Sequence, residues 1–178
     1  MKKLFIILTT LIISINSMAQ TLEERVQVIE DHIALKHLVD YFSVLADEKK
    51  GHEQEALFAP NATVTSINDL TGSVFKAEGR EQIGTSFQNF LDLHEIVYHS
   101  NGQQTLDIKG DKATGVSYCT VTMIRKNEDG SRNKSHMLTR YNDSYVKVDG
   151  KLLIKERTTH FMWQESEDIK YGFEVLRF

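Results

Sequence analysis

The sequence predicts an α+β fold, in which a curved, largely antiparallel β-sheet packs against helices formed by the first part of the chain. Three observations support this prediction. Apolar residues recur at helical spacing before residue 50, alternating strand-like patterns fill the chain after residue 94, and turn sequences separate those strands. Helices that come first and strands that come last are typical of this class.

The first element expected is a long amphipathic helix that begins at Thr21. Thr21 is a suitable N-cap, and Glu24 follows three residues later, as in a capping box. We expect Gly51 to end this helix, with one or two further helical turns over 53–58 that Pro60 stops. The apolar residues at helical spacing are Leu22, Val26, Ile29, Ile33, Tyr41, Val44 and Leu45.

The middle of the chain predicts a short hairpin and a second helix. Two short strands, 62–67 and 73–77, flank a turn that contains Asn68, Asp69 and Gly72. A helix is then expected from Arg80 to about Leu91.

Four long strands are expected from His94 onward, as a meander. Turn signals divide them at Gly110-Asp111, at 127–130 and at Asp149-Gly150. Within 114–124 the side chains alternate, and both faces are partly apolar, so we expect both to be covered. One face carries Val116, Tyr118, Thr120, Thr122 and Ile124, and the other carries Gly115, Ser117, Cys119, Val121 and Met123.

The first nineteen residues predict a cleavable signal peptide. Lys2 and Lys3 precede an apolar run that is too short to span a bilayer well, and Ser17-Met18-Ala19 ends it with small residues. Cleavage is expected before Gln20, which leaves one domain over 20–178 and predicts a periplasmic or secreted protein with no membrane attachment. An uncleaved anchor or a buried helix is the alternative.

Charge and cysteine content exclude several functions. The 21 basic and 25 acidic residues are interspersed, so no charged surface is expected to bind nucleic acid or anionic lipid. Cys119 is the single cysteine, and therefore no internal disulfide forms. Its place in an alternating strand favours a small buried hydrophobic residue over a reactive thiol.

Motif searches indicate neither a metal site nor a common cofactor site. His32 and His37 are five residues apart, on different faces of the predicted helix, and no third ligand has standard spacing. The chain also lacks a nucleophile elbow, a dinucleotide-binding glycine motif and a P-loop. We therefore expect no cofactor and no bound metal.

Four stretches of the sequence carry a family resemblance: 41–47 (YFSVLAD), 57–62 (LFAPNA), 98–101 (YHSN), and Ser135-His136 ahead of 145–150 (YVKVDG). In residues, order and spacing, these resemble the SnoaL-like branch of the nuclear-transport-factor-like superfamily, close to the scytalone dehydratase type. The resemblance covers about 26–163. It implies a cone-shaped sheet that encloses an apolar pocket for a small apolar molecule.

The resemblance also implies three catalytic residues: Asp47, His99 and His136. In dehydratase-type members, a carboxylate at the end of the first helix orients a histidine on the first long strand, and a second histidine comes from a later strand. His99 would remove a proton next to a carbonyl, and His99 or His136 would protonate a leaving hydroxyl. Each residue also has an interpretation without catalysis. Asp47 would be an acid at a helix end, His99 a core histidine and His136 a surface histidine.

The chain departs from the dehydratase pattern at two tyrosines that polarise the substrate carbonyl. Ala46 stands at the first position, and Thr65 or Ser66 at the second, which makes scytalone itself an unexpected substrate. Four strand residues have side chains that can replace these tyrosines, but the sequence does not decide which of them face inward: Tyr118, Tyr141, Arg140 and Arg157.

Two functions of different classes therefore remain open at this point. One is a cofactor-independent lyase (a dehydratase) or isomerase that acts on a small carbonyl compound. The other is a non-catalytic ligand-binding or accessory domain, which the missing tyrosines favour. A homodimer through the outer sheet face, where Phe161 and Trp163 are expected, is compatible with either function.

Overall fold

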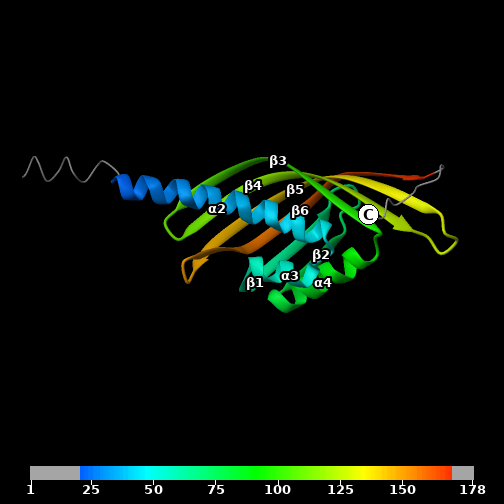
Figure 1. Ribbon diagram of the computed structural model, residues 1–178, viewed down its shortest axis with the longest axis horizontal. Helices are drawn as coiled ribbons and strands as arrows, with labels where there is room; N and C mark the ends of the chain where they lie inside the picture. Colours follow the sequence, from blue (N-terminus) through cyan, green and yellow to red (C-terminus); the bar gives the residue numbers. More distant parts are fainter. Residues whose placement is uncertain (1–20, 170–178) are drawn as a thin grey trace, which may run out of the picture.

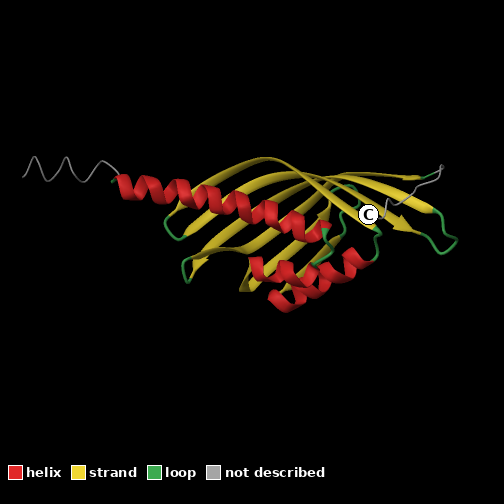
Figure 2. Cartoon of the chain, viewed as in Figure 1, coloured by secondary structure: helices red, strands yellow, loops and turns green. Residues whose placement is uncertain are grey.

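The computed structural model describes residues 21–169, so the predicted signal peptide and the last apolar residues of the chain lie outside the described residues. The elements follow the expected order, with helices first and long strands last. Figure 1 shows the long helix α2 lying along one face of a curved sheet, and α3 and α4 near β1 and β2. Figure 2 separates the same layers by type of secondary structure.

Helix α2 (Leu22–Asp47) begins as its sequence predicts. The Thr21 hydroxyl accepts a hydrogen bond from the Glu24 backbone N–H at 3.1 Å, and the Glu24 carboxylate accepts one from the Thr21 backbone N–H at 2.9 Å. These reciprocal bonds form a capping box and satisfy two N–H groups that the helix leaves unpaired.

One boundary prediction was wrong, because Gly51 begins α3 (Gly51–Gln54) instead of ending α2. A Cβ at Gly51 would overlap the backbone of Gln88 in α4 (Arg80–Asp92). The glycine is therefore needed for the close approach of two helices. A 3₁₀ turn, η1 (Glu55–Leu57), follows α3 as the predicted extra helical turn.

Six strands form one mixed, unclosed sheet in the order β2-β1-β6-β5-β4-β3. Neighbouring strands are antiparallel except β1 and β6, which run parallel. Predicted turns at 110–111, 127–130 and 149–150 connect the last four strands. The strands are β1 (Phe58–Asn68), β2 (Val74–Glu78), β3 (Ile96–Lys109), β4 (Lys112–Lys126), β5 (Arg132–Val148) and β6 (Lys151–Asp168).

The alternation predicted in β4 sets the two faces of the sheet. Ser117, Cys119, Val121 and Met123 are buried on the inner face, which the helices cover. The residues between them, Tyr118, Thr120 and Thr122, are half-buried on the outer face, and Figure 1 shows the described helices on the other side of the sheet. Within residues 21–169, the helices therefore cover the inner face only.

Candidate active site

An aspartate and a histidine meet where the long helix ends against the first long strand. Asp47 is the last residue of α2, and His99 lies near the start of β3. One Asp47 carboxylate oxygen lies 2.7 Å from His99 Nδ1 and also accepts the His99 backbone N–H at 2.9 Å. A carboxylate is normally unfavourable at a helix C-terminus, so these two bonds explain the choice of residue.

This contact fixes the state of the His99 ring. Because the Asp47 carboxylate only accepts hydrogen bonds, the proton of the neutral imidazole must sit on Nδ1, and Nε2 carries the free lone pair. The His99 side chain is 7% exposed and lines the cavity described next, whereas that of Asp47 is 26% exposed. The pair therefore places a proton acceptor in the wall of this cavity.

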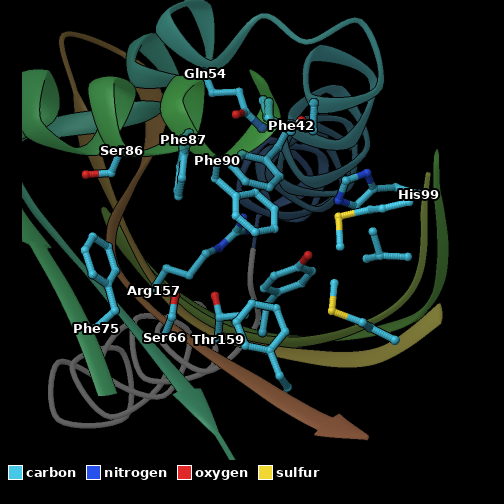
Figure 3. A pocket seen from close by; sticks show the side chains of 17 residues that line it. Phe42, Gln54, Ser66, Phe75, Ser86, Phe87, Phe90, His99, Arg157 and Thr159 are labelled. Atoms are coloured by element: carbon cyan, nitrogen blue, oxygen red, sulfur yellow. Dashed lines mark hydrogen bonds between the residues drawn. The ribbon is translucent and has the colours of Figure 1, made fainter. Parts of the chain in front are cut away.

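The cavity between the helices and the inner face of the sheet has a volume of about 320 Å³. Its walls are overwhelmingly apolar, and the polar groups are few, as is usual for pockets that bind small organic molecules. Figure 3 shows His99 and Arg157 entering the cavity on separate sides, with Phe42, Phe87 and Phe90 above. The lining also includes Ala46, Leu91, Val121, Met123, Met137, Tyr141 and Phe161.

A buried ion pair holds a positive charge in the cavity wall. Arg157 donates from Nε and Nη2 to Asp143 at 2.8 and 2.7 Å, and both side chains are 1% exposed. Tyr145 donates a third hydrogen bond to Asp143 at 2.9 Å. Burial opposes the charge on Arg157, but Asp143 outweighs burial and raises the pKa of the guanidinium, so it stays protonated.

Within residues 21–169, one nitrogen of this guanidinium has no partner. Its Nη1 is buried and has no hydrogen-bond partner among the described residues, while Arg157 itself lines the cavity. The Phe42 and Tyr141 rings stack on the guanidinium, with their centroids 4.3 and 4.5 Å from its central carbon. A donor that is held this firmly and left unsatisfied fits an anion or an oxygen of a ligand.

Both positions at which the chain departs from the dehydratase pattern line the cavity. Ala46 and Ser66 place small groups where tyrosines would take up space. Of the four residues left open by sequence, Tyr141 and Arg157 face the cavity, whereas Tyr118 and Arg140 do not line it. Burial raises the pKa of Tyr141, so its hydroxyl stays a neutral donor.

The structure does not bring His136 to the other two predicted residues. Its neighbour Met137 lines the cavity, and adjacent strand residues point to opposite faces, so the imidazole lies on the outer face. There His136 Nδ1 lies 3.0 Å from the Thr122 hydroxyl, and the ring packs edge-on against Trp163. A ligand in the cavity is therefore out of reach of His136.

Strand alternation also decides which face of the sheet Phe161 and Trp163 occupy. Phe161 lines the cavity instead of the outer face, whereas Trp163 lies on the outer face, because a bulge opposite Leu138 and Thr139 shifts the register between them.

Burial raises the pKa of the Cys119 thiol to about 12, in line with a small buried residue. Over residues 21–169, no group of three potential metal ligands clusters, and no helix is long and apolar enough to cross a bilayer.

The fold and site together define a class: an α+β cone with an apolar cavity and an aspartate-bound histidine in its wall. A model of the SnoaL-like domain matches residues 27–158, and the chain belongs to that family. A comparison with curated proteins found no significant match.

Solved structures share the fold at low sequence identity. A candidate scytalone dehydratase from Novosphingobium aromaticivorans is 19% identical, with a TM-score of 0.68 over 84% of this chain and 95% of that one. A type 2 hexachlorocyclohexane dehydrochlorinase (LinA) is 12% identical, with a TM-score of 0.69 over 85% and 98%. A candidate calcium/calmodulin-dependent protein kinase II association domain from Xanthomonas campestris is 24% identical, with a TM-score of 0.54 over 72% and 85%. These likenesses establish the fold, which hosts lyases as well as association domains.

Proposed function

We propose that the protein is a cofactor-independent lyase or isomerase that removes a proton from a small, largely apolar carbonyl compound. The observation that carries the proposal is the Asp47–His99 pair, whose free Nε2 belongs to a ring in the wall of an apolar cavity. Fold likeness to proteins described as a scytalone dehydratase and a dehydrochlorinase supports an elimination reaction. The predicted signal peptide supports action in the periplasm or outside the cell.

His99 acts as the base in the proposed reaction. Its Nε2 takes a proton from the carbon next to the carbonyl, and the C–H electron pair moves to form an enolate. Asp47 accepts the hydrogen bond from Nδ1–H throughout and stabilises the imidazolium that results. The imidazolium then protonates a leaving hydroxyl, which departs as water and leaves a conjugated double bond. In isomerisation, the same proton returns to a different carbon.

Arg157 acts on the negative charge that develops. Its buried Nη1 donates to the enolate oxygen, and Asp143 holds the guanidinium in place so that little reorganisation is needed. The Tyr141 hydroxyl lines the same cavity as a second neutral donor. Arg157 therefore takes the part that the missing tyrosines play in the dehydratase pattern, and His136 has no part in this mechanism.

Loss of water from a panel of aryl β-hydroxy ketones, followed by the absorbance of the conjugated product, tests the proposal. The substitution His99→Gln is expected to lower the rate about 10²- to 10⁴-fold. His160→Gln is the matched control, because His160 is also bonded to an aspartate but points out of the cavity. Equal rates for the wild-type protein and His99→Gln would refute a base at this position.

Nitrogen-15 NMR of the His99 ring tests the same proposal without a substrate. The expected spectrum has a protonated Nδ1 and an unprotonated Nε2, and Asp47→Asn should change that tautomer. A proton on Nε2 in the wild-type protein would contradict the proposal.

A second candidate is a binding domain that holds a small apolar ligand without transforming it. The small residues at Ala46 and Ser66 favour this function, because they leave space and remove two groups that would polarise a carbonyl. Tight binding of an aryl ketone with no turnover and no exchange of its α-protons into heavy water would support it over the lyase.

A further inference from the structure

Helix α2 carries two apolar stripes on opposite sides. One stripe is buried against the sheet and includes Leu35, Leu38 and Phe42. The second stripe, which we call the outer stripe, consists of Leu22, Val26, Ile29 and Ile33, and these residues are between 43% and 68% exposed. At about 100° per residue, the centres of the two stripes lie roughly half a turn apart around the helix axis.

The outer stripe follows the spacing of a coiled-coil seam. Its members are separated by four, three and four residues, which places Leu22 and Ile29 at d positions and Val26 and Ile33 at a positions of two heptads. The buried stripe occupies the far side of the helix, so a partner on the seam would not touch this chain's own sheet. Figure 1 shows the start of α2 extending beyond the neighbouring hairpins, and the outer stripe is exposed there.

Charged residues flank the outer stripe, and they favour a second copy of the same helix that runs parallel to the first. In the same register Arg25 is a g residue, and Glu23 and Glu30 are e residues. In a parallel pair, a g residue faces the e residue five positions later on the other helix, so Arg25 of each copy faces Glu30 of the other. Neither residue takes part in an ion pair within the described part of this chain.

An antiparallel pair of the same helices would be disfavoured. There, e residues face e residues, which brings Glu23 of each copy near Glu30 of the other. Like charges that face each other oppose association. The sequence of flanking charges thus fits a parallel arrangement only.

The seam is short, and this limits the strength of pairing. Lys36 and Asp40 occupy the next d and a positions and form an ion pair with each other along the helix. Four exposed aliphatic side chains make a patch of a few hundred Å² on each copy, on the order of the smallest specific interfaces when both copies are counted. A dimer that dissociates at micromolar concentration is therefore expected.

We propose that two copies of this chain associate through parallel α2 helices, with the outer stripes in contact and Arg25 of each copy paired with Glu30 of the other. This interface differs from the outer sheet face that the sequence suggested, and it leaves the cavity of each copy free. It does not rest on the proposed function.

Sedimentation velocity over a range of concentrations tests the proposal, with protein produced from the full-length sequence. Ile29→Glu should abolish the dimer, whereas Ala34→Glu, which is also exposed on α2 but off the seam, should retain it. Arg25→Glu should weaken association roughly tenfold by placing two acidic residues in contact, and Arg25→Glu combined with Glu30→Arg should restore it. Circular dichroism checks that each variant keeps its helix.

A cross-link decides the direction. Leu22→Cys should form an intersubunit disulfide readily on mild oxidation, because a parallel pair in register places both Leu22 positions side by side, and the native Cys119 is buried. A monomer at all concentrations, a double charge variant that stays monomeric, or a dimer unchanged by Ile29→Glu would overturn the proposal. Binding of the outer stripe to vesicles of anionic lipid, in place of self-association, would also overturn it.

Discussion

Two aspartate–histidine pairs lie on opposite faces of the same sheet, and only one of them belongs to a cavity. On the inner face, Asp47 holds His99, whose side chain is 7% exposed. On the outer face, Asp69 lies 2.9 Å from Nδ1 of His160, and these side chains are 37% and 19% exposed. The two hydrogen bonds join the same kinds of atoms at similar distances, so the bond itself does not mark a site.

What differs is the surroundings of each ring. The His99 ring lines an apolar cavity, and another part of the same wall holds Arg157, whose Nη1 has no partner among the described residues. The outer pair joins the turn between β1 and β2 to β6, where Asp69 also donates its backbone N–H to Phe161. This difference is why the proposed function rests on the inner pair, whereas the outer pair connects a turn to a strand.

The largest expected effect is on the free energy of unfolding, when an aspartate on each face of the sheet is replaced by asparagine. Asp143→Asn leaves Arg157 as an uncompensated buried charge, and we expect a loss of about 3–5 kcal/mol in the free energy of unfolding. Asp69→Asn, the same substitution on the more exposed pair, should cost less than about 1 kcal/mol. Urea unfolding followed by circular dichroism measures both variants. Equal losses would remove the distinction between the two faces.

The secondary structure was predictable because each element carries a strong local period. The capping box at Thr21 and Glu24 and the glycine turns between the long strands fixed most boundaries. Gly51 was misinterpreted, since a glycine that permits close packing of two helices looks the same in sequence as one that ends a helix. Only the three-dimensional contact with α4 distinguishes the two.

The site was only partly predictable, because strand parity depends on long-range pairing. Asp47 and His99 follow from the family resemblance together with their places at a helix end and a strand start. His136 was suggested by the resemblance alone, and the structure places its imidazole on the outer face, because neighbouring residues of a strand point to opposite faces. Arg157 remained one of four open choices. Arg157 and His160 are three residues apart on one strand, so their side chains point to opposite faces of the sheet. Had His160 been assigned to the outer face, Arg157 would have been predicted to face the cavity.

A smaller effect is expected from filling the cavity. Ala46→Phe places a ring in the space beside His99, and we expect it to weaken binding of an apolar fluorescent probe by about tenfold or more. Ala34→Phe is the matched control, with the same change at an exposed position of the same helix. Probe titration monitored by fluorescence measures both. Equal affinities in the two variants would show that the probe binds outside the cavity, and would contradict ligand binding at the inner face.

The smallest effect should come from Cys119, which lies on the inner face but does not line the cavity. Because burial raises the pKa of its thiol to about 12, the reactive thiolate is scarce near neutral pH, and a thiol reagent should label the folded protein at less than roughly one-hundredth of the rate for a free cysteine. Cys119→Ala should keep any elimination activity within about twofold and cost about 1 kcal/mol of stability by lost packing. Fast labelling, or loss of activity in this variant, would make Cys119 a reacting group. The boundary of the site would then have to include side chains beyond the cavity wall.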